Sequence, residues 1–216
     1  MDKPKSLIGL ALLTALIVGG AVLLYLRGRE PRAEVQLPGG GVAEVTPLEK
    51  MRVRTAEPYE ELDLSSYRLT VAGLVRNPLS LTFEEIRALD AQEKLVDLPC
   101  VEGWTETALW KGPRLLDLLD IAGVLEEADN VVFSSPGGYT TSLTLADIEE
   151  TDPLLAYEAN GEQLPREQGF PLRLVVPNRL GYKWIKWVTV IEVIAGDYEG
   201  FWERRGYPNS AYTSDR

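Results

Sequence analysis

The first strong pattern in the chain is an uncharged apolar run of 20 residues, from Leu7 to Leu26. About 20 residues of α-helix span the hydrocarbon core of a bilayer. Lysines precede the run and arginines follow it. A cleaved signal peptide is the rival interpretation, but its apolar stretch is typically about 7–15 residues long. A buried helix of a soluble protein is disfavoured by the paired glycines in mid-run and the abrupt charged flanks. We therefore expect one N-terminal transmembrane helix, with residues 1–27 as the membrane anchor.

Residues 28–55 show no sustained hydrophobic period. They are rich in Pro, Gly, Arg and Glu, which is typical of a tether between structured parts. We expect a flexible linker here, followed by one folded domain over residues 56–216.

Within that domain, short helical patterns have clear end signals. Thr82 precedes an apolar-periodic stretch with Glu85 three residues later, which predicts a capping box and a short helix. Pro113–Ala122 is amphipathic and is followed by Gly123, which predicts a second helix. Leu145–Glu149 predicts a third.

Strand patterns alternate with these helices. Tyr67–Leu74 has the period of a strand, and Leu95–Cys100 reads as a strand that breaks at Pro99. Asn160-Gly161 is a strong hairpin signal. Further strands are expected at Val131–Phe133, Tyr139–Leu143, Leu172–Val176 and Trp184–Ile194. The mixture indicates a single α+β domain.

Composition narrows the functional classes. The chain is 45% hydrophobic and 25% charged, as expected for a protein with a core, and its formal net charge is −11. An acidic surface repels phosphates, so we do not expect nucleic acid as a partner. The sequence contains no histidine and one cysteine. Any metal must therefore be held by few protein ligands, or must arrive already chelated.

Cys100 is the first candidate for chemistry. It lies where a predicted strand ends, within LPCVEGW, and loops at strand ends often carry functional residues. A thiolate ligand needs a metal or nearby cations to lower its pKa. The alternative is a buried, inert cysteine that packs as a small apolar side chain.

A basic cluster is the second candidate. Residues 166–186 hold five basic side chains and one acidic one, whereas residues 56–159 hold six basic and 21 acidic ones. Such a cluster in an acidic domain favours a bound anion, although salt bridges to the acidic half remain the alternative. Gly181 would allow backbone N–H groups to approach an anion closely, with Lys183 beside it.

These two regions together resemble a known family. CVEGW followed by Trp110-Lys111-Gly112-Pro113, and then NGEQLPREQGFPLRLVVPNRLGYKWIKW, resemble the molybdopterin-binding domain of the sulfite oxidase superfamily. The likeness is greatest to the catalytic subunit of bacterial protein-methionine-sulfoxide reductases, and it extends from about Tyr67 to Tyr207.

The resemblance implies a fold, a cofactor and a set of site residues. The fold would be a mixed α+β domain with a largely β core, and the cofactor would be molybdenum–molybdopterin. Cys100 would be the catalytic residue and the protein's ligand to the metal. The residues that match the family's pterin-binding stretch are Arg179, Gly181, Tyr182, Lys183 and Lys186.

The resemblance also implies an activity. The chain would be a membrane-anchored oxidoreductase that transfers an oxygen atom in a two-electron step, with a small-molecule or protein-sulfoxide-type substrate. Its electron partner would be a membrane cytochrome or a quinone-linked protein. On the family resemblance we expect the domain outside the cytoplasm, although the sequence lacks a twin-arginine pair, and that lack by itself favours a cytoplasmic domain or unusual export.

The sequence also departs from the family pattern. The segment MRVRTAEPYEELDLSSY lacks the family's Asn-containing element before the first strand, so the resemblance does not extend to that part of the pocket. This leaves open a non-catalytic binding module with a degenerate cofactor pocket on the same fold. It also leaves open a membrane-tethered scaffold in which Cys100 has no special role.

Overall fold

A computed structural model describes residues 32–58 and 61–215 of the chain. Residues 33–216 make up one compact unit. The strands are β1 (Ala33–Gln36), β2 (Val42–Val45), β3 (Leu69–Gly73), β4 (Leu79–Leu81), β5 (Ala91–Pro99), β6 (Thr105–Pro113), β7 (Asn130–Ser134), β8 (Thr140–Thr144), β9 (Leu154–Ala156), β10 (Glu158–Ala159), β11 (Glu162–Gln163), β12 (Arg173–Val175) and β13 (Val190–Ile194). The α-helices are α2 (Phe83–Ala88), α3 (Leu115–Ala122) and α4 (Leu145–Thr151), and the 3₁₀ turns are η1 (Leu48–Lys50), η2 (Arg166–Gln168), η3 (Gly181–Lys183), η4 (Glu203–Arg205) and η5 (Thr213–Asp215).

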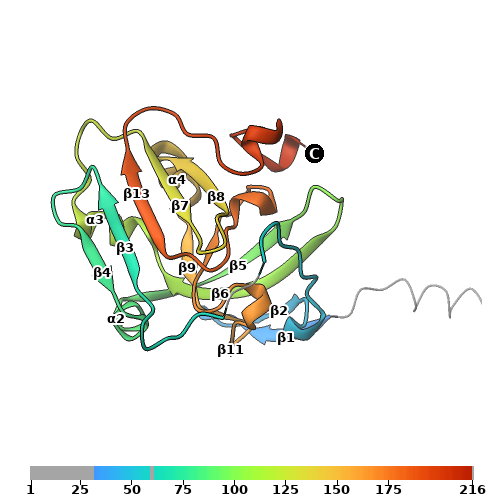
Figure 1. Ribbon diagram of the computed structural model, residues 1–216. Helices are drawn as coiled ribbons and strands as arrows, with labels where there is room; N and C mark the ends of the chain where they lie inside the picture. Colours follow the sequence, from blue (N-terminus) through green and yellow to red (C-terminus); the bar gives the residue numbers. More distant parts are fainter. Residues whose placement is uncertain (1–31, 59–60, 216) are drawn as a thin grey trace, which may run out of the picture. The chain divides into compact units, whose positions relative to one another are not determined.

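The larger sheet has the strand order β4-β3-β13-β7-β8. Figure 1 shows β13, from the C-terminal part of the chain, lying between β3 and β7. Strands β13 and β3 pair in parallel, whereas the other adjacent strands of this sheet pair antiparallel. A second sheet has the order β11-β10-β6-β5 and is dominated by the long β5–β6 hairpin (Figure 1). This mixed α+β architecture with a largely β core confirms the expected fold class.

The helix signals in the sequence are confirmed. Thr82 and Glu85 exchange the side-chain and backbone hydrogen bonds of a capping box at the start of α2. Helix α3 ends at Gly123, whose φ of 70° is the left-handed conformation that glycine adopts at little cost. At the β10–β11 hairpin, Asn160 and Gly161 both have positive φ, as a two-residue hairpin turn requires.

The predicted long strand Trp184–Ile194 is wrong in its first half. The strand begins only at Val190. Trp187 has a φ of 54°, which interrupts an extended backbone. Trp184 and Ile185 are buried instead in the main core cluster, where Trp184 packs edge-on against Trp110.

Residues 33–55 differ from the expected linker. They form the β1–β2 hairpin and η1, and they bury Val45, Leu48 and Met51. The backbone N–H of Thr46 donates to the carbonyl of Thr107 on β6, and Asn160 Nδ2 donates to the carbonyl of Thr46. The compact unit accordingly starts at Ala33 rather than near residue 56.

The membrane anchor expected at residues 1–27 lies outside the described residues. Within the described part of the chain, no helix is both long enough and apolar enough to cross a membrane.

Candidate functional site

A cavity of about 390 Å³ brings together parts of the chain that are far apart in sequence. Its walls come from residues 52–57, the turn between β5 and β6, the stretch 181–187 and the C-terminal segment. Cys100, Gly181, Tyr182 and Lys186 all line it, so four residues predicted from the sequence meet in one place.

Cys100 is positioned by the turn that joins β5 to β6. Its backbone N–H donates to the carbonyl of Trp104 (2.9 Å), and its own carbonyl accepts from the N–H of Gly103 (3.0 Å). Gly103 has a φ of 91°, which the turn requires and which favours glycine. The turn holds the half-buried Cys100 at the cavity wall.

Gly181 joins the second motif to this turn. A Cβ added there would lie 3.3 Å from the carbonyl oxygen of Pro99 and 3.3 Å from Cδ1 of Leu98. The absence of a side chain therefore lets η3 approach the end of β5, one residue before Cys100.

Lys186 and Arg173 supply buried positive charge to the cavity. Lys186 Nζ donates to the carbonyl of Glu167 (2.6 Å), and Arg173 Nη1 donates to the carbonyl and the side chain of Gln168 (3.1 Å each). Burial lowers the pKa of Arg173 to about 10. Burial and the neighbouring Arg173 charge lower the pKa of Lys186 to about 7. An anion in the cavity would favour the charged form of both groups.

The same two cations provide a test of whether an anionic cofactor fits. Arg173 Nε is buried and has no hydrogen-bond partner among the residues that the structure describes. Among the described residues, no carboxylate forms a salt bridge with Arg173 or Lys186, although the domain is acidic. An unpaired guanidinium N–H and two buried cations beside a half-buried thiol suit a ligand that combines a phosphate with a thiol-ligated metal.

Two further cations come from the segment that departs from the family pattern. Arg54 Nε lies 3.0 Å from Glu102 Oε2, which also accepts from the Trp104 indole N–H (2.8 Å). The Arg52 guanidinium lies 5.1 Å from the Trp104 ring, in cation–π geometry. Sequence reasoning missed both residues, because nothing local shows that this segment returns to the β5–β6 turn.

Aromatic rings form much of the remaining wall. Trp104, Tyr139, Trp184, Trp187, Trp202 and Tyr207 all line the cavity beside Tyr182. Tyr182 is fixed at both ends, since its hydroxyl donates to the carbonyl of Pro208 (2.6 Å) and its carbonyl accepts from the Tyr139 hydroxyl (2.5 Å).

Arg179 and Lys183 are not among the residues that line the cavity. The Arg179 side chain is fully buried and lies 2.6 Å from Asp147 Oδ1 and 3.0 Å from Glu150 Oε2. The Lys183 side chain is also fully buried and lies 2.6 Å from Glu203 Oε1. Both were expected to contact the pterin, and the structure instead engages both in ion pairs with carboxylates.

Comparison with known proteins establishes the family. Residues 56–202 match the model of the oxidoreductase molybdopterin binding domain, and the chain belongs to this family. It is therefore an oxidoreductase domain of the class that uses a molybdenum cofactor, as the sequence resemblance predicted.

The chain is similar to several relatives, two of which carry sulfur chemistry in their names. The chain is 42% identical over 151 residues to the uncharacterized oxidoreductase YuiH of Bacillus subtilis (strain 168), covering 69% of this chain and 76% of the relative. It is 32% identical over 200 residues to the sulfite oxidase of Arabidopsis thaliana, covering 76% and 51%. It is 33% identical over 147 residues to the putative protein-methionine-sulfoxide reductase subunit YedZ1 of Azospira oryzae, covering 68% and 56%. The chain thus spans about half the length of the last two.

A solved structure shares the fold. The sulfane dehydrogenase SoxCD from Paracoccus pantotrophus matches with a TM-score of 0.62 and 25% identity. The match covers 80% of this chain and 52% of that one.

Proposed function

We propose that the chain is a membrane-anchored molybdenum-cofactor oxidoreductase that transfers an oxygen atom to or from a sulfur-type substrate in a two-electron step. The observation that carries this proposal is the shared cavity, in which Cys100 lies with the buried cations Arg173 and Lys186. Relatives named as a sulfite oxidase and a putative protein-methionine-sulfoxide reductase subunit support a small-molecule or protein-sulfoxide-type substrate.

Each wall of the cavity has a role in this proposal. Cys100 would provide a thiolate to the metal, and its turn would fix the direction of that ligand. Lys186 and Arg173 would hold the pterin phosphate, Arg173 through its unpaired Nε–H. The backbone of Gly181 and the aromatic ring of Tyr182 would contact the cofactor. When bound, the cofactor supplies a metal that changes oxidation state by two electrons and exchanges an oxo group.

The two arginines that line the cavity at the β5–β6 turn, Arg52 and Arg54, would bind the substrate rather than the cofactor. Arg54 is held by Glu102, two residues after Cys100, and Arg52 lies over the Trp104 ring. Both carry charge at the β5–β6 turn, where a polar sulfur–oxygen group would meet hydrogen-bond donors. The aromatic rings would contact the apolar part of such a substrate and displace water.

The apolar run Leu7–Leu26 would hold the domain at a membrane, beside a membrane cytochrome or a quinone-linked protein that exchanges electrons with it. Such a partner would exchange electrons with the site, since these 216 residues contain no histidine for a b-type haem and one cysteine, too few for an iron–sulfur cluster.

Metal analysis tests the proposal. The full chain would be produced in a host with the molybdenum-cofactor pathway and in a host without it, beside the Cys100→Ser variant. We expect about one molybdenum per chain in the first host and none in the second, with a loss of about tenfold or more in Cys100→Ser because the hydroxyl is a poor soft-metal ligand.

Two controls make the result decisive. The folded state of each sample would be checked by circular dichroism, so that metal loss is not confused with unfolding. Full retention of molybdenum by folded Cys100→Ser would contradict the ligand assignment. Absence of molybdenum from the folded wild-type chain in the competent host would instead favour the non-catalytic binding module.

A further inference from the structure

Lys183 has a saturated set of partners. A lysine ammonium has three N–H donors. In the buried Lys183 side chain, Nζ donates to Glu203 Oε1 (2.6 Å), Asn209 Oδ1 (2.7 Å) and the carbonyl of Ser142 (2.9 Å). All three donors are used within the protein in this structure. These hydrogen bonds give Lys183 a structural role, and its contact with the pterin stays a prediction.

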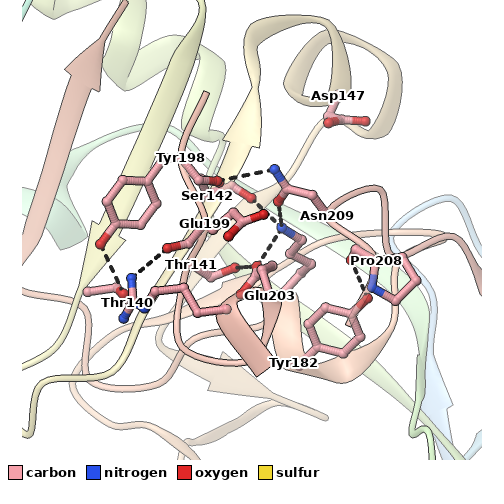
Figure 2. A network of polar contacts seen from close by, with 12 residues as sticks. Thr140, Thr141, Ser142, Asp147, Tyr182, Tyr198, Glu199, Glu203, Pro208 and Asn209 are labelled. Atoms are coloured by element: carbon pink, nitrogen blue, oxygen red, sulfur yellow. Dashed lines mark hydrogen bonds and ion pairs between the residues drawn. The ribbon is translucent and has the colours of Figure 1, made fainter. Parts of the chain in front are cut away.

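These partners belong to a polar network that joins β8 to the C-terminal segment (Figure 2). Glu203 Oε1 also accepts from the Thr141 hydroxyl (2.7 Å). Ser142 Oγ and Asn209 Nδ2 both donate to the carbonyl of Tyr198 (2.9 and 3.1 Å). We name residues 196–212 the C-terminal strap, since this network holds the segment against β8.

The strap approaches β8 closely along its backbone. The N–H of Phe201 donates to the carbonyl of Thr140 (2.8 Å), and a Cβ on Gly200 would lie 2.3 Å from that same oxygen. Further along, the N–H of Leu180 donates to the carbonyl of Ala211 (2.8 Å). The strap is thus attached on both sides of η4.

The strap provides a wall of the cavity. Trp202 and Tyr207 line the cavity, and their ring centroids lie 5.0 Å apart. Tyr207 also meets the Tyr182 ring edge-on at 5.3 Å. The position of these rings depends on the network, because Glu203 lies directly after Trp202 and Asn209 lies two residues beyond Tyr207.

Most of the strap's anchoring residues lie outside the matched family domain. The family model ends at residue 202, whereas Glu203, Tyr207 and Asn209 follow it. The wall formed by the strap therefore extends past the end of the family match.

We propose that Lys183 is a positioning residue whose buried ion pair with Glu203 holds the C-terminal strap, so that Trp202 and Tyr207 limit the size of the substrate that enters the cavity. The part that concerns substrates rests on the proposed function. The part that concerns the ion pair does not, and it can be tested separately.

Limited proteolysis tests the ion pair in the full chain in detergent micelles. Arg204 and Arg205 are exposed trypsin sites within η4, but their cleavage requires that the strap opens. Lys183→Met leaves Glu203 charged, buried and without its partner, so we expect cleavage to be about tenfold faster or more. Adding Glu203→Gln removes that charge, and we expect the double variant to return to within about threefold of the wild-type rate.

This rescue separates the two roles of Lys183. If Lys183 held the cofactor phosphate, the double variant would lose molybdenum as fully as the single variant, because the cation is missing from both. In our proposal the double variant recovers strap protection and keeps its molybdenum, because no contact with the phosphate is lost. The proposal would be overturned if Lys183→Met were cleaved at the wild-type rate. It would also be overturned if the double variant were cleaved as fast as Lys183→Met.

Substrate size tests the second part. In the molybdenum-loaded enzyme, with reduced viologen as the electron source, kcat/KM would be compared for dimethyl sulfoxide and for methyl p-tolyl sulfoxide. Each sulfoxide takes up two electrons and two protons and yields the sulfide and water. Tyr207→Ala opens the wall, and we expect the ratio of the two kcat/KM values to shift about fivefold or more toward the bulky sulfoxide.

The possible failures are distinguishable. An unchanged ratio in Tyr207→Ala would overturn the substrate-size role while the proteolysis result stands. If the loaded wild-type enzyme reduces neither sulfoxide, the proposed sulfoxide chemistry fails and the size role fails with it. The proteolysis and rescue measurements need no turnover and still decide whether the ion pair holds the strap.

Discussion

Arg173 and Lys186, which both line the cavity, flank the same glycine, Gly169. A Cβ built on Gly169 would lie 3.0 Å from the Cβ of Arg173 and 3.2 Å from the Cβ of Lys186. The charge of Arg173, added to burial, disfavours the protonated form of Lys186. Two buried cations that repel each other cost folding free energy, and a bound anion would offset that cost.

This arrangement makes stability depend on the protonation of Lys186. Its pKa is lowered from 10.5 to about 7 in the folded protein. Between those values the unfolded chain binds a proton that the folded chain does not. Raising the pH from about 7 to 10 should therefore stabilise the cofactor-free domain, by up to about 1.4 kcal/mol per pH unit. Below about pH 7 Lys186 is protonated in both the folded and the unfolded chain, so it no longer makes the free energy of unfolding depend on pH.

Urea unfolding of residues 33–216 at pH 7, 8 and 9 measures this slope. Lys186→Met keeps the buried stem without the charge, so its free energy of unfolding should rise less steeply with pH than that of the wild type. Lys50→Met, at an exposed site, serves as the matched control. Equal slopes in wild type and Lys186→Met would contradict the lowered pKa.

Gly181→Ala tests the contact between the two motifs. The new Cβ would lie 3.3 Å from the Pro99 carbonyl oxygen, so η3 or the Cys100 turn must shift by a few tenths of an ångström. We expect a loss of about 1 kcal/mol or more in the free energy of unfolding, together with reduced molybdenum content. Gly39→Ala is the control, because nothing lies within 4 Å of a Cβ at that position. Wild-type stability and metal content in Gly181→Ala would show that the close approach is not needed.

Thr82→Ala tests the capping box of α2. The substitution removes the acceptor of the Glu85 N–H and leaves that group dependent on water. We expect a loss of about 1 kcal/mol in the free energy of unfolding, measured with urea. Thr82→Ser keeps the hydroxyl and should stay near the wild type. A similar loss in both variants would point to lost packing of the threonine methyl group instead.

Removal of residues 1–27 tests the anchor. The full chain should sediment with membranes and resist extraction by salt and alkali, because an apolar helix of about 20 residues partitions into the bilayer. The shortened chain should move to the supernatant and keep its molybdenum, since the cavity is built from residues after Ala33. Full-length chain in the supernatant of washed membranes would refute the anchor.

The sequence determined the features that depend on neighbouring residues. The capping box at Thr82, the left-handed end of α3 at Gly123 and the Asn160-Gly161 hairpin all follow from local backbone chemistry, and the structure shows each one. The family and its cofactor were also readable, because long motifs keep their residues in order along the chain.

Tertiary structure decided which charged groups face the cavity and which are neutralised elsewhere. Arg179 and Lys183 belong to the same basic stretch as Lys186, yet their carboxylate partners lie on α4 and on the C-terminal strap. Arg173 lies buried on β12 beside the cavity and has no carboxylate in ion-pair contact within the described part of the chain. Burial and ion pairing depend on segments that are distant in sequence, so the spacing of basic residues along the chain could not show which of them remain available to an anion.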